Sequence, residues 1–461
     1  MQNVITIDVA GFKRILDMMK PVISNKSALP ILGDVKLDWD KQAGMFRLTG
    51  SNTDSWLTAD CADPKTNDDG DIEMVPCVHM LQEDTKEHWH PVCLPYADLR
   101  ETFSLLPAAR RCTVTFDESA DGQRLMTIDY QDGQMSLSYD AADEYPESPT
   151  LVTRGDDRDR RREELAAQVA ALQEQNSTDG LATLQQELAA IPEPICRFRI
   201  ESPSLLGPVR EARTCAANDE LRPVMNGVCL DTFADHLVVV ASDGHKFYKN
   251  VIETGVGYLD YKTFPALDPQ TGEPGSAKLI VPKTVMATIN AAFQQAINIT
   301  VTADSRRLQF STLGVNFVAL CIEGRYPNYE SVIPRDNPYK VQMSRDTLKM
   351  ALRRVQLSAD GSSNMATMLG DGTAFVIEAS NMLNSKSGSE RVPVQQTDAF
   401  LPQGFKIGMK ILSTLDLLDL LDEDNIVFYF SDPSRAFLLR NESPKLQSKT
   451  LLQMPMLVNE A

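Results

Sequence analysis

Histidine and cysteine side chains gather in one short window of the sequence. Cys77, His79, His88, His90 and Cys93 bring sulfur and nitrogen donors together, and mixed donors of this kind suit Zn²⁺. Their spacing matches no standard zinc finger, so an irregular loop explains them without a metal. We expect no metal here. A zinc protein or metal-dependent enzyme centred on this window remains an alternative.

An aspartate and a histidine flank a glycine at Asp243, Gly244 and His245. A carboxylate and an imidazole close together could serve acid–base catalysis. Catalysis would also need a nucleophile or a metal, and no GxSxG, HExxH or phosphate-loop pattern accompanies the pair. The aspartate and glycine are better interpreted as a turn that leaves a strand. We therefore predict a protein that is not an enzyme and holds no cofactor.

Length and composition predict a multidomain globular protein. The 461 residues suggest two to four domains, and 43% apolar with 24% charged residues is typical of a folded protein. The eight cysteines are scattered without CxxC pairs, as expected of reduced thiols rather than disulfides. We find no signal-peptide pattern and no run of apolar residues long enough to span a membrane, so we expect a cytoplasmic protein.

Three rounds of one pattern run along the chain. Each round opens with a helical pattern that carries basic residues, near residues 12–16, 205–213 and 348–354. A second helix is expected after Pro95, after Pro282 and around residues 409–421, because proline is well placed to begin a helix. The three closing segments are related, and they are Glu144-Tyr145-Pro146, Arg325-Tyr326-Pro327 and Met454-Pro455-Met456.

The stretches between the helices alternate apolar and polar residues. Residues 297–311 and 425–439 have the two-residue period of half-buried antiparallel strands. Three α+β units of one design are therefore the economical interpretation.

One segment, from Arg154 to Pro194, does not fit the rounds. Leucine and valine recur there at helical spacing on both sides of a break at residues 177–180, which predicts an inserted helical hairpin. A self-packed spacer and a docking surface for a partner are both open interpretations. The expected domains are residues 1–152, the insertion 153–194, and residues 195–335 and 336–461.

Four segments, in order along the chain, resemble the bacterial DNA polymerase III beta subunit (beta sliding clamp) family. They are Ala28-Leu29-Pro30-Ile31-Leu32-Gly33, residues 221–228 with 240–246, residues 323–334, and Gln453-Met454-Pro455-Met456-Leu457-Val458. The resemblance implies three repeated clamp domains, each with an antiparallel sheet outside and two helices inside. It further implies a head-to-tail homodimeric ring, closed by contacts between the first and third domains.

In that family the ring encircles duplex DNA without regard to sequence and tethers DNA polymerase, the clamp loader and repair proteins. The formal charge of −19 would disfavour a protein that grips phosphates by affinity. A closed ring is held by topology, so a modest basic lining inside an acidic exterior is enough. We expect long cations on or just after the first helix of each round to face DNA: Lys13, Arg14, Lys20, Lys26, Arg210, Arg213, Lys349, Arg353 and Arg354. For any one of them, a solvated helix face is the plainer explanation.

The resemblance also implies a pocket for short, mostly apolar partner peptides. Carried over position by position, it comprises Met225, Ser242, Gly244, His245, Lys246, Phe247, Pro327, Val332, Met454, Pro455 and Met456, with Leu457 and Val458 at its edge. Thioethers adapt to many ligands, although Met454 and Met456 could equally be core residues of a last strand.

The sequence departs from the family at three places near this pocket. Ser331 and Leu457 replace basic residues, and residues 459–461 extend the usual end. Peptide preference can therefore differ from that of a housekeeping clamp. A clamp-like paralogue from a mobile element or phage, with a specialised partner, is the second hypothesis.

Overall fold

The computed structural model describes residues 3–23, 29–67, 72–83, 89–108, 110–119, 122–175, 180–254, 258–269, 272–371, 373–381, 383–396, 401–402, 404–443, 446 and 448–458. Within these ranges the chain forms two compact units. Unit 1 comprises residues 1–206, 257–264 and 284–321, and unit 2 comprises residues 207–256, 265–283 and 322–461.

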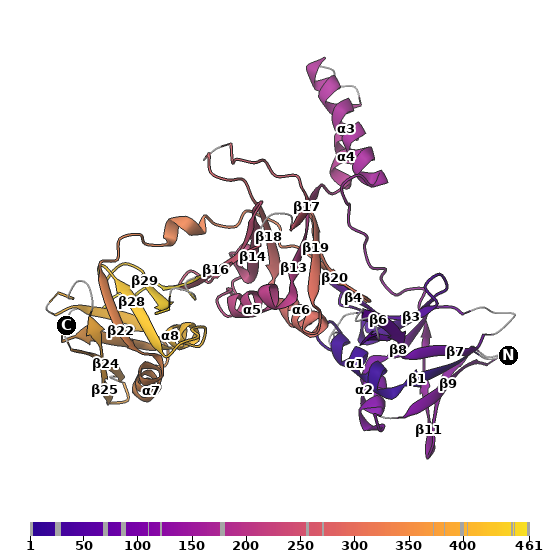
Figure 1. Ribbon diagram of the computed structural model, residues 1–461, viewed down its shortest axis with the longest axis horizontal. Helices are drawn as coiled ribbons and strands as arrows, with labels where there is room; N and C mark the ends of the chain where they lie inside the picture. Colours follow the sequence, from indigo (N-terminus) through magenta and orange to yellow (C-terminus); the bar gives the residue numbers. More distant parts are fainter. Residues whose placement is uncertain are drawn as a thin grey trace. The chain divides into compact units, whose positions relative to one another are not determined.

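One order of elements occurs three times along the chain (Figure 1). The first repeat contains β1 (Asn3–Asp8), α1 (Val9–Met19), η1 (Pro30–Gly33), β2 (Asp34–Asp40), β3 (Met45–Ser51), β4 (Ser55–Asp60), β5 (Ala62–Thr66), β6 (Ile72–Pro76), β7 (Val78–Gln82), β8 (Val92–Pro95), α2 (Tyr96–Leu105), β9 (Arg111–Glu118), β10 (Arg124–Tyr130), β11 (Gly133–Ser138) and β12 (Asp140–Ala141).

The second repeat contains β13 (Pro194–Glu201), α5 (Ser202–Arg213), η2 (Pro223–Asn226), β14 (Gly227–Thr232), β15 (His236–Ser242), β16 (Lys246–Glu253), β17 (Leu259–Lys262), β18 (Ala277–Pro282), η3 (Lys283–Val285), α6 (Met286–Phe293), β19 (Asn298–Asp304), β20 (Arg307–Thr312), β21 (Val315–Leu320) and η4 (Tyr329–Val332). The third contains β22 (Tyr339–Ser344), α7 (Arg345–Gln356), β23 (Met365–Gly370), β24 (Ala374–Asn381), β25 (Lys386–Pro393), β26 (Gln395–Gln396), β27 (Lys406–Lys410), α8 (Ile411–Leu418), β28 (Asn425–Phe430), β29 (Phe437–Asn441) and β30 (Lys449–Gln453).

Local sequence explains where the first helices begin. Asp8 caps α1 by accepting a hydrogen bond from the backbone N–H of Gly11, at 3.4 Å. Ser344 caps α7 in the same way through the N–H of Thr347, at 3.1 Å. The second helices α2, α6 and α8 lie where the prolines and the apolar pattern predicted them. The predicted order of helices is therefore confirmed.

Strands from two repeats pair edge to edge inside each unit. In unit 1, β4 pairs with β21 to build a ten-stranded antiparallel sheet in the order β12-β8-β2-β3-β4-β21-β20-β19-β13-β17. In unit 2, β16 pairs with β30 in a nine-stranded sheet, β18-β14-β15-β16-β30-β29-β28-β22-β26. We call the β4–β21 pairing the first seam and the β16–β30 pairing the second seam.

Two smaller sheets complete the first and third repeats. Their orders are β11-β10-β9-β1-β7 and β25-β24-β23-β27, and β5 with β6 forms a separate two-stranded ribbon. In unit 1, α1 contacts both α2 and α6, and the rings of Phe12 and Phe103 meet at 4.8 Å between α1 and α2. In unit 2, α7 packs against α8 and against β24 and β25. Helices thus cover the sheets within each unit.

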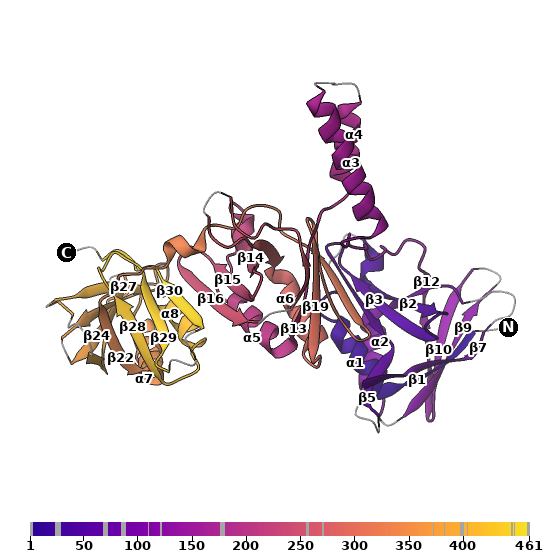
Figure 2. The same ribbon diagram turned by 45° about the horizontal axis from the view of Figure 1, so that its top comes forward.

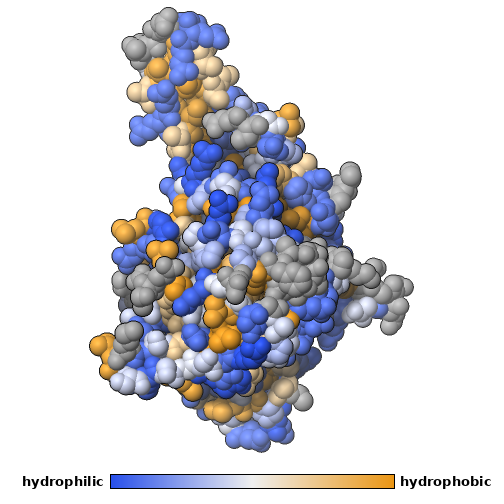
Figure 3. Space-filling view, turned by 90° about the vertical axis from the view of Figure 1, so that its left-hand side faces the viewer, coloured by the Kyte–Doolittle hydropathy of each residue, from blue (hydrophilic) through white to orange (hydrophobic). Residues whose placement is uncertain are grey.

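Two helices, α3 (Asp157–Glu174) and α4 (Leu181–Ala190), occupy the segment between the first two repeats and project together from unit 1 (Figure 2). Leu165 and Val169 are buried, whereas no described residue of α4 is. Arg162 pairs with Glu193 at 3.1 Å, and Arg306 donates to the carbonyl of Ala189 at 2.8 Å. These contacts attach the base of the hairpin to unit 1. Apolar and hydrophilic side chains lie side by side on its surface in Figure 3.

Candidate functional site

A cavity of about 140 Å³ opens in unit 2 where β16 begins and β30 ends. The residues that line it come from the second and third repeats, and they are Met225, Ser242, Gly244, His245, Lys246, Phe247, Tyr326, Pro327, Asn328, Tyr329, Val332, Leu452 and Met454. We call it the seam pocket.

A tight turn between β15 and β16 forms one wall of the seam pocket. The Asp243 carboxylate accepts hydrogen bonds from the backbone N–H groups of His245 and Lys246, both at 2.8 Å. Gly244 has a φ of +89°, a conformation that side chains disfavour, and Arg222 packs where a Cβ would point. The predicted turn is therefore confirmed. The Asp243 carboxylate accepts hydrogen bonds from backbone amides of the turn. This role in the turn explains why an aspartate lies close to His245 in the sequence, with no need for catalysis.

The floor of the pocket is apolar and its rim is exposed. Phe247 and Leu452 belong to the core of unit 2, with 2% and 3% of their surfaces exposed. Met454 and Val332 at the rim are 40% and 52% exposed. The backbone N–H of Met454 donates to the carbonyl of His245 at 2.8 Å, which continues the second seam to the pocket mouth. A firm apolar floor beneath exposed thioether and aliphatic side chains suits a short apolar ligand.

A buried polar network fixes the third side of the pocket. The hydroxyl of Tyr329 donates to Asp231, which is 1% exposed, at 2.6 Å, and Lys278 pairs with the same carboxylate at 3.1 Å. Lys249 and Lys278 each lie 5.8 Å from the centre of the Tyr329 ring. Burial and the neighbouring Asp231 raise the pKa of Tyr329 above its usual value, so its proton stays in place. The network holds η4, and with it Val332, against the sheet.

The structure brings most of the predicted pocket residues together. Those that line the cavity are Met225, Ser242, Gly244, His245, Lys246, Phe247, Pro327, Val332 and Met454. Those that lie outside its lining are Pro455, Met456, Leu457 and Val458. The chain turns away after Met454, because Met456 donates its N–H to Gly408 at 2.9 Å and forms a β-bridge there. The role of these four residues in binding stays a prediction.

Sequence reasoning missed Tyr326, Asn328, Tyr329 and Leu452 as lining residues. Leu452 lies two residues before Met454 on an extended strand, so strand alternation could have found it. Tyr329 follows Pro327 in a segment with no regular period, and only the fold shows that its ring turns inward.

The structure separates the predicted DNA-facing cations that it describes into three groups. Paired cations are Arg14 with Asp63 at 2.9 Å, Arg354 with Glu390 at 2.7 Å, and Lys349 with Asp419. Lys13 is half-buried and donates to the carbonyl of Ser104. Exposed cations without an ion pair among the described residues are Lys20, Arg210, Arg213 and Arg353. Lys26 lies outside the described residues.

Lys283, at the start of η3, was not among the predicted cations. Burial, with Arg213 and Lys246 nearby, lowers its pKa, and its ammonium donates to the carbonyl of Ala217. It adds positive charge beside the end of α5.

The cysteine and histidine window takes no part in the seam pocket. Cys77 and Cys93 are buried, and desolvation raises the pKa of each thiol to about 12. His79 and His90 are exposed, and His88 lies outside the described residues. Among the residues that the structure describes, no group of three or more histidine, cysteine or acidic side chains could hold a metal ion. Trp89 within the window packs on Phe46 at 4.9 Å, as part of an aromatic core.

Comparison with known proteins identifies the third repeat. Residues 330–456 match the family model for the DNA polymerase III beta subunit, C-terminal domain. The beta sliding clamp of Synechocystis sp. is 22% identical over 426 residues, which cover 89% of this chain and 90% of that protein. The beta sliding clamp of Bacillus subtilis is 22% identical over 441 residues, covering 95% and 94%. The chain is thus similar to beta sliding clamps over most of its length.

Solved structures of the beta sliding clamp family share the fold over nearly the whole chain. A sliding clamp of Pseudomonas aeruginosa, solved with griselimycin bound, superposes with a TM-score of 0.74 at 16% identity and covers 99% of this chain and 100% of that one. The DNA polymerase III beta subunit of Thermotoga maritima gives a TM-score of 0.73 at 17% identity, covering 99% and 100%. The predicted α+β fold of three clamp domains is confirmed. No helix among the described residues is long and apolar enough to cross a membrane.

Proposed function

We propose that this protein is a DNA sliding clamp, a non-catalytic processivity factor that closes around duplex DNA in the cytoplasm. It tethers DNA polymerase and other clamp-binding proteins through short apolar peptides held in the seam pocket. The supporting evidence is its similarity to beta sliding clamps over most of the chain, the seam pocket and the order of its sheets.

The observation that carries ring formation is the pairing rule of the two seams. The strand that corresponds to β4 in one repeat pairs with the third strand after the second helix of the next repeat, so β4 meets β21 and β16 meets β30. The rule leaves β25 in the third repeat and β11 in the first repeat as edges of their sheets. A third seam would join β25 of one copy to β11 of another. Two copies joined head to tail would close on themselves.

The edge strand β11 is suited to such a seam. Most of β11 is exposed, including the apolar side chain of Met135, which is 39% exposed. An exposed edge strand that carries apolar side chains pairs readily with another chain unless something covers it. Pairing between copies would satisfy both edges at once.

The exposed cations of the first helices give the ring a basic lining. Lys20, Arg210, Arg213 and Arg353 would reach phosphates without reading base edges. Because a closed ring is retained by topology, these few contacts are compatible with the net charge of −19.

Two measurements test the proposal together. The mass in solution should be twice the 51.1 kDa of one chain. Protein loaded on nicked circular DNA by a clamp loader should stay bound and should leave after the circle is cut. Met135→Lys places a charge on β11 and should shift the protein toward monomers. The matched control is Leu81→Lys on β7, the opposite edge of the same sheet, where the leucine is 60% exposed.

Two results would contradict this function. One is a wild-type protein that stays monomeric at high concentration and in the presence of the loader. The other is equal release from circular and linear DNA as salt increases, because simple phosphate binding behaves in that way.

A further inference from the structure

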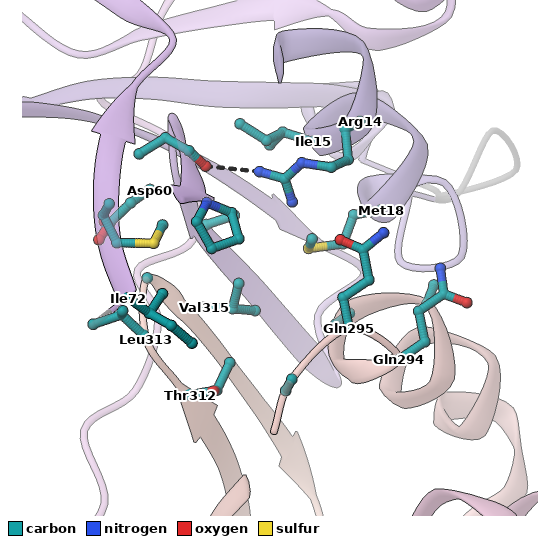
Figure 4. A pocket seen from close by; sticks show the side chains of 18 of the residues that line it. Arg14, Ile15, Met18, Asp60, Ile72, Gln294, Gln295, Thr312, Leu313 and Val315 are labelled. Carbon is teal, nitrogen blue, oxygen red and sulfur yellow. Dashed lines mark hydrogen bonds between the residues drawn. The ribbon is translucent and has the colours of Figure 1, made fainter. Parts of the chain in front are cut away.

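A second cavity, of about 860 Å³, lies in unit 1 at one end of the first seam. The seam pocket lies at the other end of the second seam, where β16 begins and β30 ends. The second cavity opens where β4 ends and β21 begins, and the N–H of Asp60 donates there to the carbonyl of Gly314 at 2.7 Å. The walls come from α1, the β5–β6 ribbon, the end of α6 and the turn between β20 and β21 (Figure 4). We call it the ribbon cavity.

One wall of the ribbon cavity is apolar. The ribbon contributes Pro64 and Met74, which are cross-strand partners, and Ile72. Figure 4 shows Ile72, Leu313 and Val315 gathered on one side. Ile72 is 44% exposed and Leu313 is 57% exposed, so apolar surface faces solvent within a hollow.

The ribbon is seated on the turn that completes this wall. Gly314 has a φ of +71°, and the methyl carbon of Met74 lies 2.6 Å from where a Cβ would stand. Only glycine allows that approach. The ribbon forms a sheet of its own in the first repeat, beside the ten-stranded sheet. The ribbon forms a wall of the cavity, although it takes no part in the strand pairing between repeats.

The lining also carries charged side chains, with a surplus of positive charge: Lys13, Arg14 and Arg199 against Asp17 and Asp60. Arg14 is held by Asp63, Asp17 pairs with Arg100 at 2.9 Å, and Asp60 pairs with Arg47 at 2.8 Å. Two cations of the lining have no carboxylate partner among the described residues, and these are Lys13 and Arg199. The Lys13 ammonium donates to the Ser104 carbonyl, so the positive charges of Lys13 and Arg199 are not neutralised by a described carboxylate and favour an anionic group in the ligand.

We propose that the ribbon cavity binds a short peptide of a partner protein in which an apolar residue stands next to an acidic residue. The apolar side chain packs against Ile72, Met74 and Leu313, and the carboxylate pairs with Lys13 or Arg199. Among the described lining residues there is no aromatic ring on which a base could stack, and two carboxylates line the cavity, so nucleic acid fits it less well. The inference does not depend on ring closure or on the seam pocket.

Peptide selection on the full-length protein tests this inference. A random heptapeptide library is panned against the Val332→Asp variant, which places a charge on the apolar rim of the seam pocket and disfavours apolar peptides there, and enriched peptides are labelled with fluorescein and titrated. We expect enriched peptides to carry an acidic residue beside an apolar one. Leu313→Asp, Ile72→Asp and Arg199→Glu should each weaken their binding by about tenfold or more, which is about 1.4 kcal/mol or more. Leu81→Asp, an exposed leucine on β7, should leave binding unchanged.

Three results would overturn the inference. One is a panning experiment with no enrichment on a variant whose thermal melting matches the wild type. Another is a set of enriched peptides whose affinity is unchanged by both Arg199→Glu and Leu313→Asp. The third is displacement of the peptide by an oligothymidylate whose own binding is lost in Arg199→Glu, which would assign the cavity to nucleic acid.

Discussion

The first and second seams share one backbone register and differ in which end is open. Ser55 lies opposite Ala319 in the first seam, as Lys246 lies opposite Gln453 in the second. The N–H of Leu320 donates to the carbonyl of Asp54 at 2.9 Å, matching the bond from Met454 to His245. Strand pairing is thus the same in both seams. The segments that pack against each seam decide which of its ends carries a cavity.

The segment that closes each repeat decides whether a pocket forms. Leu151 follows Tyr145 in the first repeat at the distance at which Val332 follows Tyr326 in the second. Leu151 is 2% exposed, whereas Val332 is 52% exposed. In the first seam the N–H of Val152 donates to Asp304 at 3.3 Å, which draws the closing segment inward. In the second seam, Tyr329 and Asp231 hold the segment at the rim. Two repeats can therefore share the same strand pairing while the closing segment of one repeat is buried and that of the other is exposed.

The largest expected effect is on the free energy of unfolding, and it distinguishes the buried Leu151 from the exposed Val332. Leu151→Ala should lower the free energy of unfolding by about 2–5 kcal/mol, because it leaves a cavity in a packed site. Val332→Ala should lower it by about 0.5 kcal/mol or less, because the side chain is exposed. Urea denaturation of the two variants measures both values. Equal losses would mean that the two closing segments are packed alike.

The second expected effect concerns the network that holds the pocket rim. Tyr329→Phe removes the hydrogen bond to Asp231 and should cost about 1–3 kcal/mol of unfolding free energy. Affinity for a clamp-motif peptide should fall as well, because η4 would no longer be held in place. Calorimetry gives stability and affinity on the same samples. Tyr339→Phe, whose ring packs on Phe405 at 6.4 Å, is the control and should change stability little.

The third expected effect exchanges the residues at the two seam turns. Thr53 has a φ of +77° at the position that corresponds to Gly244, where φ is +89°. Gly244→Thr should destabilise the protein by about 1 kcal/mol, because a β-branched side chain disfavours positive φ. Thr53→Gly should stabilise it by only about 0.3 kcal/mol, because relief of the positive φ is largely offset by the greater conformational entropy that glycine loses on folding. Thermal melting of both variants tests the exchange, and an unchanged Gly244→Thr protein would contradict it.

The last expected effect is no larger than that of Gly244→Thr and depends on pH. It concerns Asp34, whose carbonyl accepts a hydrogen bond from the Tyr145 hydroxyl of the first repeat. Burial, with Asp140 and Asp98 nearby, raises the pKa of Asp34 from 3.8 to about 6. The folded protein therefore binds this proton more tightly than the unfolded chain, and stability falls as pH rises from about 4 to 6. Asp34→Asn should raise the unfolding free energy at pH 8 by about 1 kcal/mol after allowance for solvent screening, with the gain vanishing below pH 4. Urea titrations across this range check it, and a gain that is independent of pH would contradict the assignment.

Much of the seam pocket could be predicted from the sequence. Which of the predicted cations form ion pairs could not. Ser242 to Phe247 form a strand, a turn and a strand within a few residues. Local signals predict the turn, and the family resemblance implies that these residues belong to a pocket. Arg14, Lys349 and Arg354 have the helical spacing of a basic face, but each meets a carboxylate from elsewhere in the chain. Asp63 and Asp419 lie far from their partners in sequence. No local pattern predicts such pairings.

The sequence by itself determined the repeated order of helices and strands, because caps, prolines and apolar periods act on neighbouring residues. It also determined the turn at Asp243, whose carboxylate binds amides beside it. Only the tertiary structure decided that β4 meets β21, that Leu151 is buried while Val332 is exposed, and that Tyr329 lines a cavity. Those outcomes depend on contacts between residues distant in the chain, where burial and packing outweigh local preference.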